Sequence, residues 1–181
     1  MDGTAFLRSL RAVRRFSEEP IPDGVLRDIL EVARWTGSSK NTQPWELVVV
    51  RDRAVLTDLS QSGRYAGHLA GAQAGVALVM EAGAVFDAGR LAQNIMLAAW
   101  AHGVGSCIAS LYPEENHCRA REMLGVPDPR RVDTVISLGY PADASARRLS
   151  SGPPEVRAAV PVGRTPLSDL VNWERYGRRA P

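Results

Sequence analysis

The sequence is poor in cysteine and histidine, and the spacing of these residues excludes several classes of protein. Its 181 residues include only two cysteines, Cys107 and Cys118, and they form no CxxC pair. This usage argues against a disulfide-stabilised scaffold and fits a reducing compartment. The three histidines, His68, His102 and His117, fall into no metal-ligand spacing. We therefore expect neither a structural nor a catalytic metal site.

Long apolar runs and a strong net charge are also missing. No apolar run approaches the roughly 20 residues that cross a membrane, and residues 76–80 are only a strand-length burst, so we predict no membrane partner. The net charge is only +2, and the amino-terminal arginines are not interleaved with aromatic residues. Nucleic acid is therefore not a predicted partner. With no visible secretory signal, we expect a cytoplasmic protein, and its apolar fraction of 45% is typical of a globular domain.

Several catalytic signatures are absent as well. The sequence contains no GxGxxG fingerprint, no P-loop, no GxSxG elbow and no recognisable Ser/His/Asp set. Cys107 has apolar neighbours, which favours a buried and unreactive thiol over a nucleophile. We therefore expect no catalytic side chain, and any difficult chemistry would have to come from a cofactor.

Hydrophobic periodicity divides the chain into alternating helices and strands. Helices are predicted at residues 2–10, 23–33, 53–60, 86–102 and 114–124, and strands at 47–50, 76–80, 105–110 and 132–138. From residue 142 to 161 the composition shifts to Ser, Gly, Pro, Ala and Arg, which indicates a long arm. This pattern favours a mixed αβ sandwich within one domain, residues 1–181.

The helix predicted at residues 86–102 is apolar almost all round, and Gly103 stands where a helix-ending glycine belongs. A helix of this kind lies inside the protein or inside a subunit interface.

Two polar segments are candidates for binding a ligand. In the loop before the strand at 47–50, Asn41 and Gln43 are two residues apart, so in an extended chain their amides would face the same way and suit the edge of a heterocycle. The loop's composition is equally typical of an ordinary helix-to-strand connection. The basic segment 11–16 could place guanidinium groups on a phosphate, although a solvated basic face has the same composition. Arg164 is a further phosphate candidate.

Six segments, taken in order, resemble the nitroreductase family of flavin-dependent oxidoreductases. They are Arg11-Ala12-Val13-Arg14-Arg15-Phe16, the loop from Gly37 to Trp45, Asp87-Ala88-Gly89-Arg90-Leu91-Ala92-Gln93-Asn94, Gly103-Val104-Gly105-Ser106, Gly139-Tyr140-Pro141 and Arg164-Thr165-Pro166-Leu167. Each motif is weak alone, but six in the same order along nearly the whole chain are specific.

The resemblance implies an α+β fold, namely an αβα sandwich around a central mixed, mostly antiparallel sheet. It also implies an intertwined homodimer with two FMN sites at the interface. The arm, residues 142–181, would then wrap the partner subunit.

The resemblance likewise assigns the cofactor-binding residues. They are Arg11, Ala12, Val13, Arg14 and Arg164 at the phosphate and pyrimidine side, Ser38, Ser39, Asn41 and Gln43 in the loop of the partner subunit, and Ile108, Ala109, Ser110 and Leu111 along the isoalloxazine. The backbone N–H of Ser110 would lie near flavin N5. In such enzymes NAD(P)H gives hydride to N5 and leaves, and a small acceptor such as a nitroaromatic, quinone or enone then takes the electrons.

Two other functions are compatible with this sequence. One is a specialised flavoenzyme that dehydrogenates or modifies a single metabolite. The other is a flavin-poor relative that acts as a binding protein, because Leu10 and Ala12 stand where the family motif has an arginine and a serine. The choice between NADH and NADPH, and between FMN and a deazaflavin, is not encoded in a recognisable motif.

Overall fold

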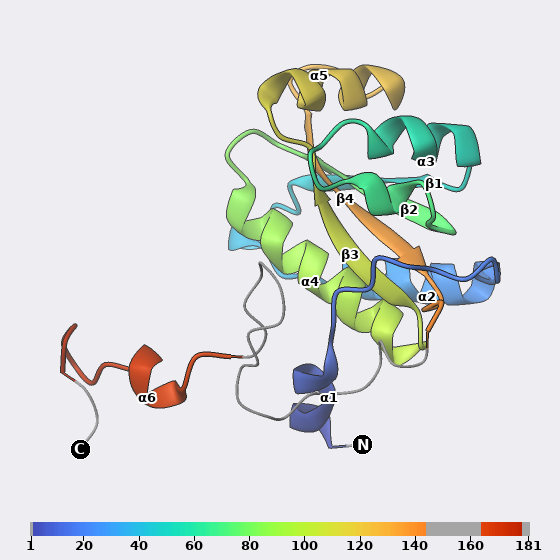
Figure 1. The fold of residues 1–181 in the computed structure, drawn as a ribbon. Helices are drawn as coiled ribbons and strands as arrows, with labels where there is room; N and C mark the ends of the chain where they lie inside the picture. Colours follow the sequence, from blue (N-terminus) through green and yellow to red (C-terminus); the bar gives the residue numbers. More distant parts are fainter. Residues whose placement is uncertain (1, 144–163, 179–181) are drawn as a thin grey trace. The chain divides into compact units, whose positions relative to one another are not determined.

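The structure is a computed structural model that describes residues 2–143 and 164–178 (Figure 1). The chain divides into two compact units, residues 1–147 and 148–181, which are described separately. Residues 144–163 of the predicted arm, and its last three residues, lie outside the described residues. The prediction of a single domain whose arm wraps a partner therefore stays a prediction.

The first unit is built on one four-stranded antiparallel sheet. Its strands are β1 (Trp45–Val50), β2 (Ala74–Met80), β3 (Gly105–Ser110) and β4 (Arg131–Gly139), in the order β1-β2-β4-β3. The only parallel pairing within the described residues is an isolated bridge between Ala12 and Ser106, beside β3. The predicted, mostly antiparallel sheet is confirmed.

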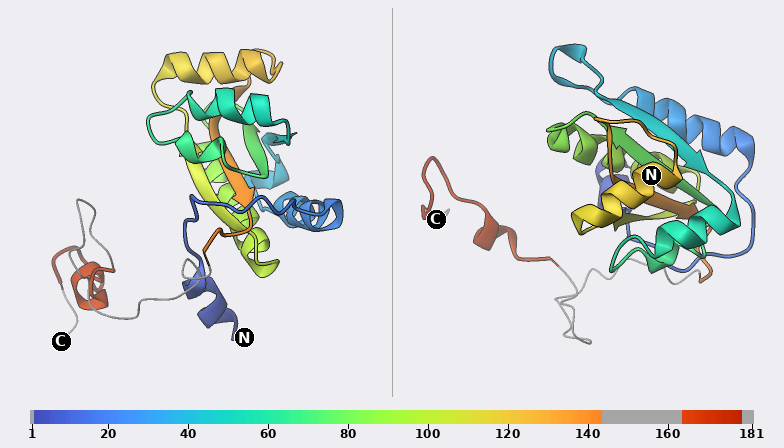
Figure 2. Two further views of the ribbon diagram at one scale, coloured as in Figure 1. Left: turned by 45° about the vertical axis from the view of Figure 1, so that its right-hand side comes forward. Right: turned by 90° about the horizontal axis from the view of Figure 1, so that it is seen from above.

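Helices cover both faces of this sheet, which confirms the predicted sandwich (Figures 1 and 2). Helices α2 (Asp23–Arg34) and α4 (Val85–Ala101) pack on one face, whereas α3 (Arg53–Ser60) and α5 (Glu114–Met123) cover the other. Shorter elements complete the unit, namely α1 (Gly3–Ser9) and the 3₁₀ turns η1 (Ser39–Asn41) and η2 (Gly67–Leu69).

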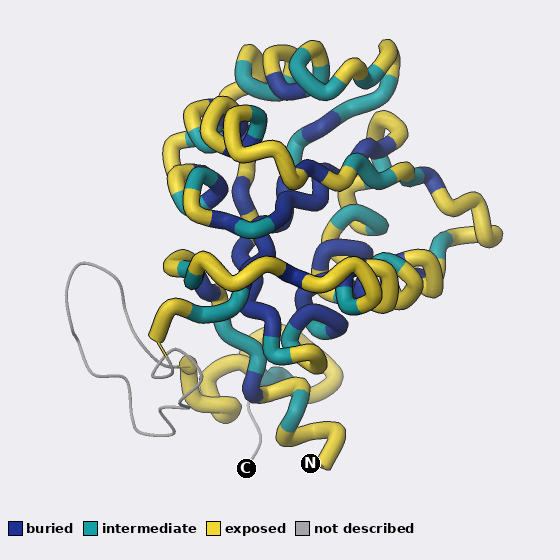
Figure 3. The backbone as a smooth tube through the Cα atoms, turned by 90° about the vertical axis from the view of Figure 1, so that its right-hand side faces the viewer, coloured by how far each residue is buried: buried dark blue, intermediate teal, exposed yellow. Residues whose placement is uncertain are grey.

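The sequence of β2 explains why the sheet has two cores. All seven of its residues are buried. Because side chains alternate along a strand, Val76 and Leu78 belong to the core under α2 and α4, while Ala77 and Val79 belong to the core under α3 and α5. Figure 3 shows the buried backbone concentrated along these inner strands.

Helix α4 is buried along most of its length but not at its first turn. Leu91 and Ile95 are fully buried, and Gly103 adopts a positive φ of 73° just past the helix end, as predicted. Val85 and Phe86, in contrast, are 75% and 79% exposed. The two predicted environments are the protein interior and a subunit interface. The first is confirmed for the helix from Leu91 onward, and an interface at the first turn stays a prediction.

The basic segment 11–16 meets the sheet at the start of β3 and just beyond the end of β4. Besides the bridge at Ala12, the N–H of Val13 donates to the carbonyl of Ser106 at 2.8 Å, and Phe16 pairs with Pro141. The glycine at the start of β3 permits this close approach, because a Cβ on Gly105 would lie 2.7 Å from the Cβ of Val13. The predicted extended conformation is thus confirmed, and it is held by the sheet.

The second unit contains α6 (Leu167–Leu170) and a turn in which the N–H of Trp173 donates to the carbonyl of Arg178 at 2.7 Å. Leu167 and Trp173 are exposed, so the expected packing of this apolar stretch stays a prediction. Among the described residues, no helix is both long enough and apolar enough to cross a membrane.

Candidate functional site

Alternation along the edge segment separates its buried residue from its charged ones. Val13 is buried against the sheet, whereas Ala12 and Arg14 on either side of it are exposed. The charge of Arg14 acts on two groups near it. Burial is the main cause that lowers the pKa of His68, and the Arg14 charge adds to it, whereas at Cys107 burial raises the pKa and the Arg14 charge partly offsets that rise. A guanidinium is therefore held at the sheet edge, where it can contact an anion from solvent.

Arg11 has a partly structural role. One of its terminal nitrogens, Nη1, donates to the carbonyls of Arg8 at 2.8 Å and Leu10 at 2.7 Å, at the end of α1. A cation in this position satisfies carbonyls that the helix leaves unpaired. Helix α1 is itself tied to α4, because Trp100 Nε1 donates to Ser9 Oγ at 2.8 Å. Arg11 is thus held in place by hydrogen bonds that use only one nitrogen, Nη1, of its guanidinium.

The end of β3 presents backbone groups to the same edge. The Ser106 carbonyl faces outward to Val13, while the N–H of Leu111 turns inward to the Asp133 carbonyl at 3.1 Å. Because backbone groups alternate along a strand, those of Ile108 and Ser110 face outward with Ser106. The structure therefore brings the predicted Ser110 N–H to the edge that carries Arg14.

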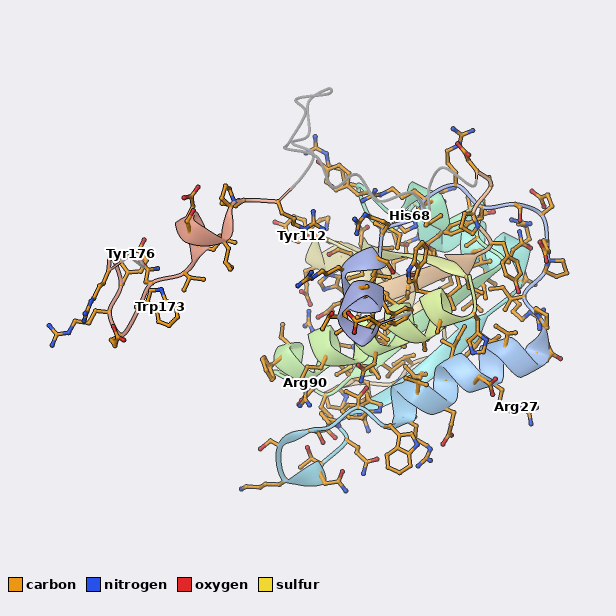
Figure 4. The ribbon with its side chains drawn as sticks, turned by 90° about the horizontal axis from the view of Figure 1, so that it is seen from below. Arg27, His68, Arg90, Tyr112, Trp173 and Tyr176 are labelled. Atoms are coloured by element: carbon orange, nitrogen blue, oxygen red, sulfur yellow. The ribbon has the colours of Figure 1, made fainter. Side chains whose placement is uncertain are left out.

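A half-buried histidine lies beside β3, and the sequence did not indicate it as a site residue. His68 Nδ1 is 2.8 Å from the hydroxyl of Ser137, which in turn donates to the Cys107 carbonyl at 3.2 Å. Burial is the largest cause that lowers the pKa of His68, and the Arg14 charge adds to it. Figure 4 labels His68, which belongs to η2. A neutral ring is thus favoured here.

Cys107 matches its prediction. Its side chain is buried, and that burial raises the pKa of the thiol, so the reactive thiolate is disfavoured. Within the described residues, no group of three or more His, Cys, Asp or Glu side chains could hold a metal ion.

The loop from Ser38 to Gln43 does not have the predicted extended conformation. Lys40, Asn41 and Gln43 all adopt positive φ, at 52°, 56° and 49°, and η1 forms a tight turn. The expected parallel alignment of the two amides is therefore wrong, because it requires an extended chain. The turn is closed instead by Ser38 Oγ, which accepts from the N–H of Gln43 at 2.8 Å.

This loop projects from the first unit at one end of β1 (Figure 2). Asn94 of α4 anchors its start, donating from Nδ2 to Thr36 Oγ1 at 2.8 Å. Four non-glycine residues of the described chain have positive φ, and three of them lie here. Such conformations are costly for residues with a Cβ and often mark binding sites.

The structure brings together only some of the predicted site residues. Ala12 and Val13 pair with Ser106, two residues before the segment Ile108–Leu111 on the same strand, so these two groups of predicted residues lie near one edge of β3. The hydrogen bonds recorded for Ser38–Gln43 stay within the loop, and none reaches that edge. Arg164 belongs to the second unit. A loop that projects from one protomer can contribute to the edge of another.

Comparisons with known proteins agree with this geometry. A family model described as the nitroreductase family matches residues 7–80 and 66–140. An Archaeoglobus fulgidus protein, provisionally named NADH dehydrogenase/NAD(P)H nitroreductase, is 35% identical over 142 residues, which cover 74% of this chain and 82% of that protein. A Thermus thermophilus NADH dehydrogenase is 26% identical, with 90% of this chain and 91% of that one covered.

Solved structures show the same architecture. An FMN-dependent nitroreductase from Clostridium difficile superposes with a TM-score of 0.73 at 28% identity. The match covers 77% of this chain and 88% of that one.

Proposed function

The chain belongs to the nitroreductase family, and from that premise we propose that it is an FMN-dependent oxidoreductase that passes hydride equivalents from NAD(P)H to a small organic acceptor. Nitroaromatic, quinone and enone compounds are the acceptor types that we propose. The working unit in this proposal is a cytoplasmic homodimer.

The observation that carries the proposal is the edge of β3. There, the cation of Arg14 and the outward-facing N–H of Ser110 lie near the same edge, while the Cys107 thiol is buried and its pKa is raised. Such an edge can bind and polarise a ligand but offers no nucleophile or acid–base pair. This arrangement is expected when a bound cofactor supplies the reactive atom and the protein supplies binding and orientation.

The donor set fits FMN. Arg14, the uncommitted part of the Arg11 fork and Arg164 would hold the phosphate and the pyrimidine side of the ring, together with the backbone at Ala12 and Val13. Ser38, Ser39, Asn41 and Gln43 of a second protomer would complete the site, and Ile108–Leu111 would lie along the ring. When bound, the flavin supplies hydride chemistry at N5. The protein's groups orient it, and a cation near its pyrimidine favours the reduced anionic form.

One observation favours a second candidate, a flavin-poor binding protein. The family motif has an arginine and a serine where this chain has Leu10 and Ala12, and Arg11 already uses Nη1 at the end of α1. Each lost charge-assisted contact weakens binding by about 1.5–3 kcal/mol. Arg14 and the rest of the Arg11 guanidinium still offer donors, so we favour the enzyme.

The test is to purify the protein, record its visible absorbance, and identify the released chromophore by chromatography. A yellow protein that releases FMN and oxidises NADH or NADPH with a quinone or nitroaromatic is the expected result. A colourless protein that also fails to bind added FMN would refute the proposal and favour the binding protein. Turnover with one metabolite only would favour the specialised flavoenzyme.

A further inference from the structure

A cavity of about 240 Å³ lies between the sheet and the first turns of α4. Leu78 and Met80 of β2 and Ile108 of β3 form its sheet side, and Ala88 and Ala92 of α4 face them. The lining is mostly apolar. An apolar cavity of about 150 Å³ is already large enough to bind benzene, so this one has room for a substituted ring.

The cavity exists because α4 carries small residues on this side of its first turns. Ala84, Ala88 and Ala92 recur every four residues, which places them on one face of the helix, the face towards the sheet. Further along, Ile95 and Met96 fill the corresponding space in the core. Protein interiors are normally close-packed, so a space of this size that borders the sheet indicates a ligand.

One end of the cavity is polar but offers no available cation. The guanidinium of Arg131 donates to both carboxylate oxygens of Glu114 at 3.0 Å and to Asp133 Oδ2 at 3.1 Å. No other Arg or Lys lines the cavity, whereas Glu81 and Asp133 do. An anionic ligand would therefore meet carboxylates and a guanidinium that is already paired.

The hydroxyl of Thr134 lies at the same end. Within the described residues it has no recorded hydrogen-bond partner, and Thr134 is only half-buried. A hydroxyl can donate to a carbonyl or nitro oxygen of a ligand. The polar end thus suits a neutral oxygen acceptor.

Ile108 connects the cavity to the candidate cofactor site. Its side chain is 47% exposed and lines the cavity, and its backbone begins the Ile108–Leu111 segment. Under the proposed function that segment lies along the flavin ring. A molecule in the cavity would therefore be next to the flavin.

We propose that this cavity is the acceptor subsite and that it selects neutral, single-ring acceptors bearing a carbonyl or nitro oxygen over anionic ones. The proposal rests on the proposed function, because it names the acceptor class of that same site. Thr134 binds the oxygen, and the apolar wall formed by Leu78, Ala88 and Ile108 binds the ring.

The experiment uses the FMN-loaded protein and three redox-inert probes of similar size, acetophenone, benzoate and toluene, with binding measured by titration calorimetry. Acetophenone is expected to bind at least tenfold more tightly than benzoate. Thr134→Val removes the hydroxyl but keeps the shape, and should weaken acetophenone about three- to tenfold while toluene is unchanged. Ala88→Leu fills the cavity and should abolish binding of acetophenone and toluene.

Ala101→Leu makes the same change at an exposed position of α4 outside the cavity, and should leave all affinities unchanged. Benzoate binding as tightly as acetophenone, or a Thr134→Val variant indistinguishable from wild type, would overturn the subsite. A folded Ala88→Leu protein that no longer holds FMN would also overturn it, because the cavity would then belong to the cofactor. If wild-type protein binds no FMN, the proposed function fails, and the acceptor subsite fails with it.

Discussion

Val13 lies directly against Gly105, so that a Cβ added to this glycine would stand 2.7 Å from the Cβ of Val13 and 2.8 Å from its Cγ2. The contact accompanies the hydrogen bond from the Val13 N–H to the carbonyl of Ser106. It holds the arginine segment against β3. The position of Arg14 therefore depends on the absence of a side chain on the neighbouring strand.

Gly105→Ala should displace this segment. Val13 is β-branched and buried, so the clash cannot be relieved by moving a flexible side-chain end. We expect a loss of about 1–3 kcal/mol in the free energy of unfolding, measured with urea, and weaker FMN binding. Gly24→Ala is the matched control. Its added Cβ meets nothing within 4 Å, and in helix α2 the change should stabilise by about 0.5–1 kcal/mol. Equal stability of the two variants would contradict the prediction.

Arg14→Gln should change both ligand binding and the titration of His68. Loss of the charge should weaken FMN about 10- to 150-fold. Because the Arg14 cation lowers the pKa of His68, its removal should raise that pKa, measured by NMR on the flavin-free protein. Arg27→Gln removes a guanidinium that points outward from α2 (Figure 4) and should change neither quantity. An unshifted His68 in Arg14→Gln would show that the two groups are not coupled.

The unfolding free energy should fall as the pH drops below about 6.5. Burial lowers the pKa of His68 in the folded state below its ordinary value of 6.5, so the unfolded chain binds the proton first. Stability is then lost as the pH falls from about 6.5 towards the lowered pKa. His68→Gln should flatten this slope in urea titrations between pH 5 and 7.5. Well above the ordinary value of 6.5, at about pH 8 and higher, the ring is neutral in both states, so the two proteins should show the same pH dependence there. A slope unchanged by His68→Gln would refute the assignment.

Thr36→Val should loosen the projecting loop. Thr36 is 3% exposed, and the substitution removes the acceptor of Asn94 Nδ2, so a half-buried amide loses its partner. We expect a cost of about 1–3 kcal/mol and faster hydrogen exchange at residues 38–43. Thr42→Val makes the same change at an exposed residue of the loop and should alter neither. Similar exchange rates in the two variants would argue that the Asn94 bond does not hold the loop.

The sequence by itself determined the elements and their faces. Local rules were sufficient, because caps, periodicity and glycine positions act over one or two turns. Helix α3 has the predicted bounds, Gly103 ends α4 as predicted, and the edge segment is extended. The ordered motifs also indicated the family, which the comparisons then showed.

Only the tertiary structure decided how distant segments meet. Arg14 and His68 are 54 positions apart in the sequence, and their coupling arises from the packing of both around β3. The loop at Asn41 and Gln43 is compact because a tertiary anchor and a local hydroxyl replace the extended conformation that its spacing suggested. The cavity beside Ile108 likewise depends on which face of α4 packs against which strand, and no local sequence pattern encodes that packing.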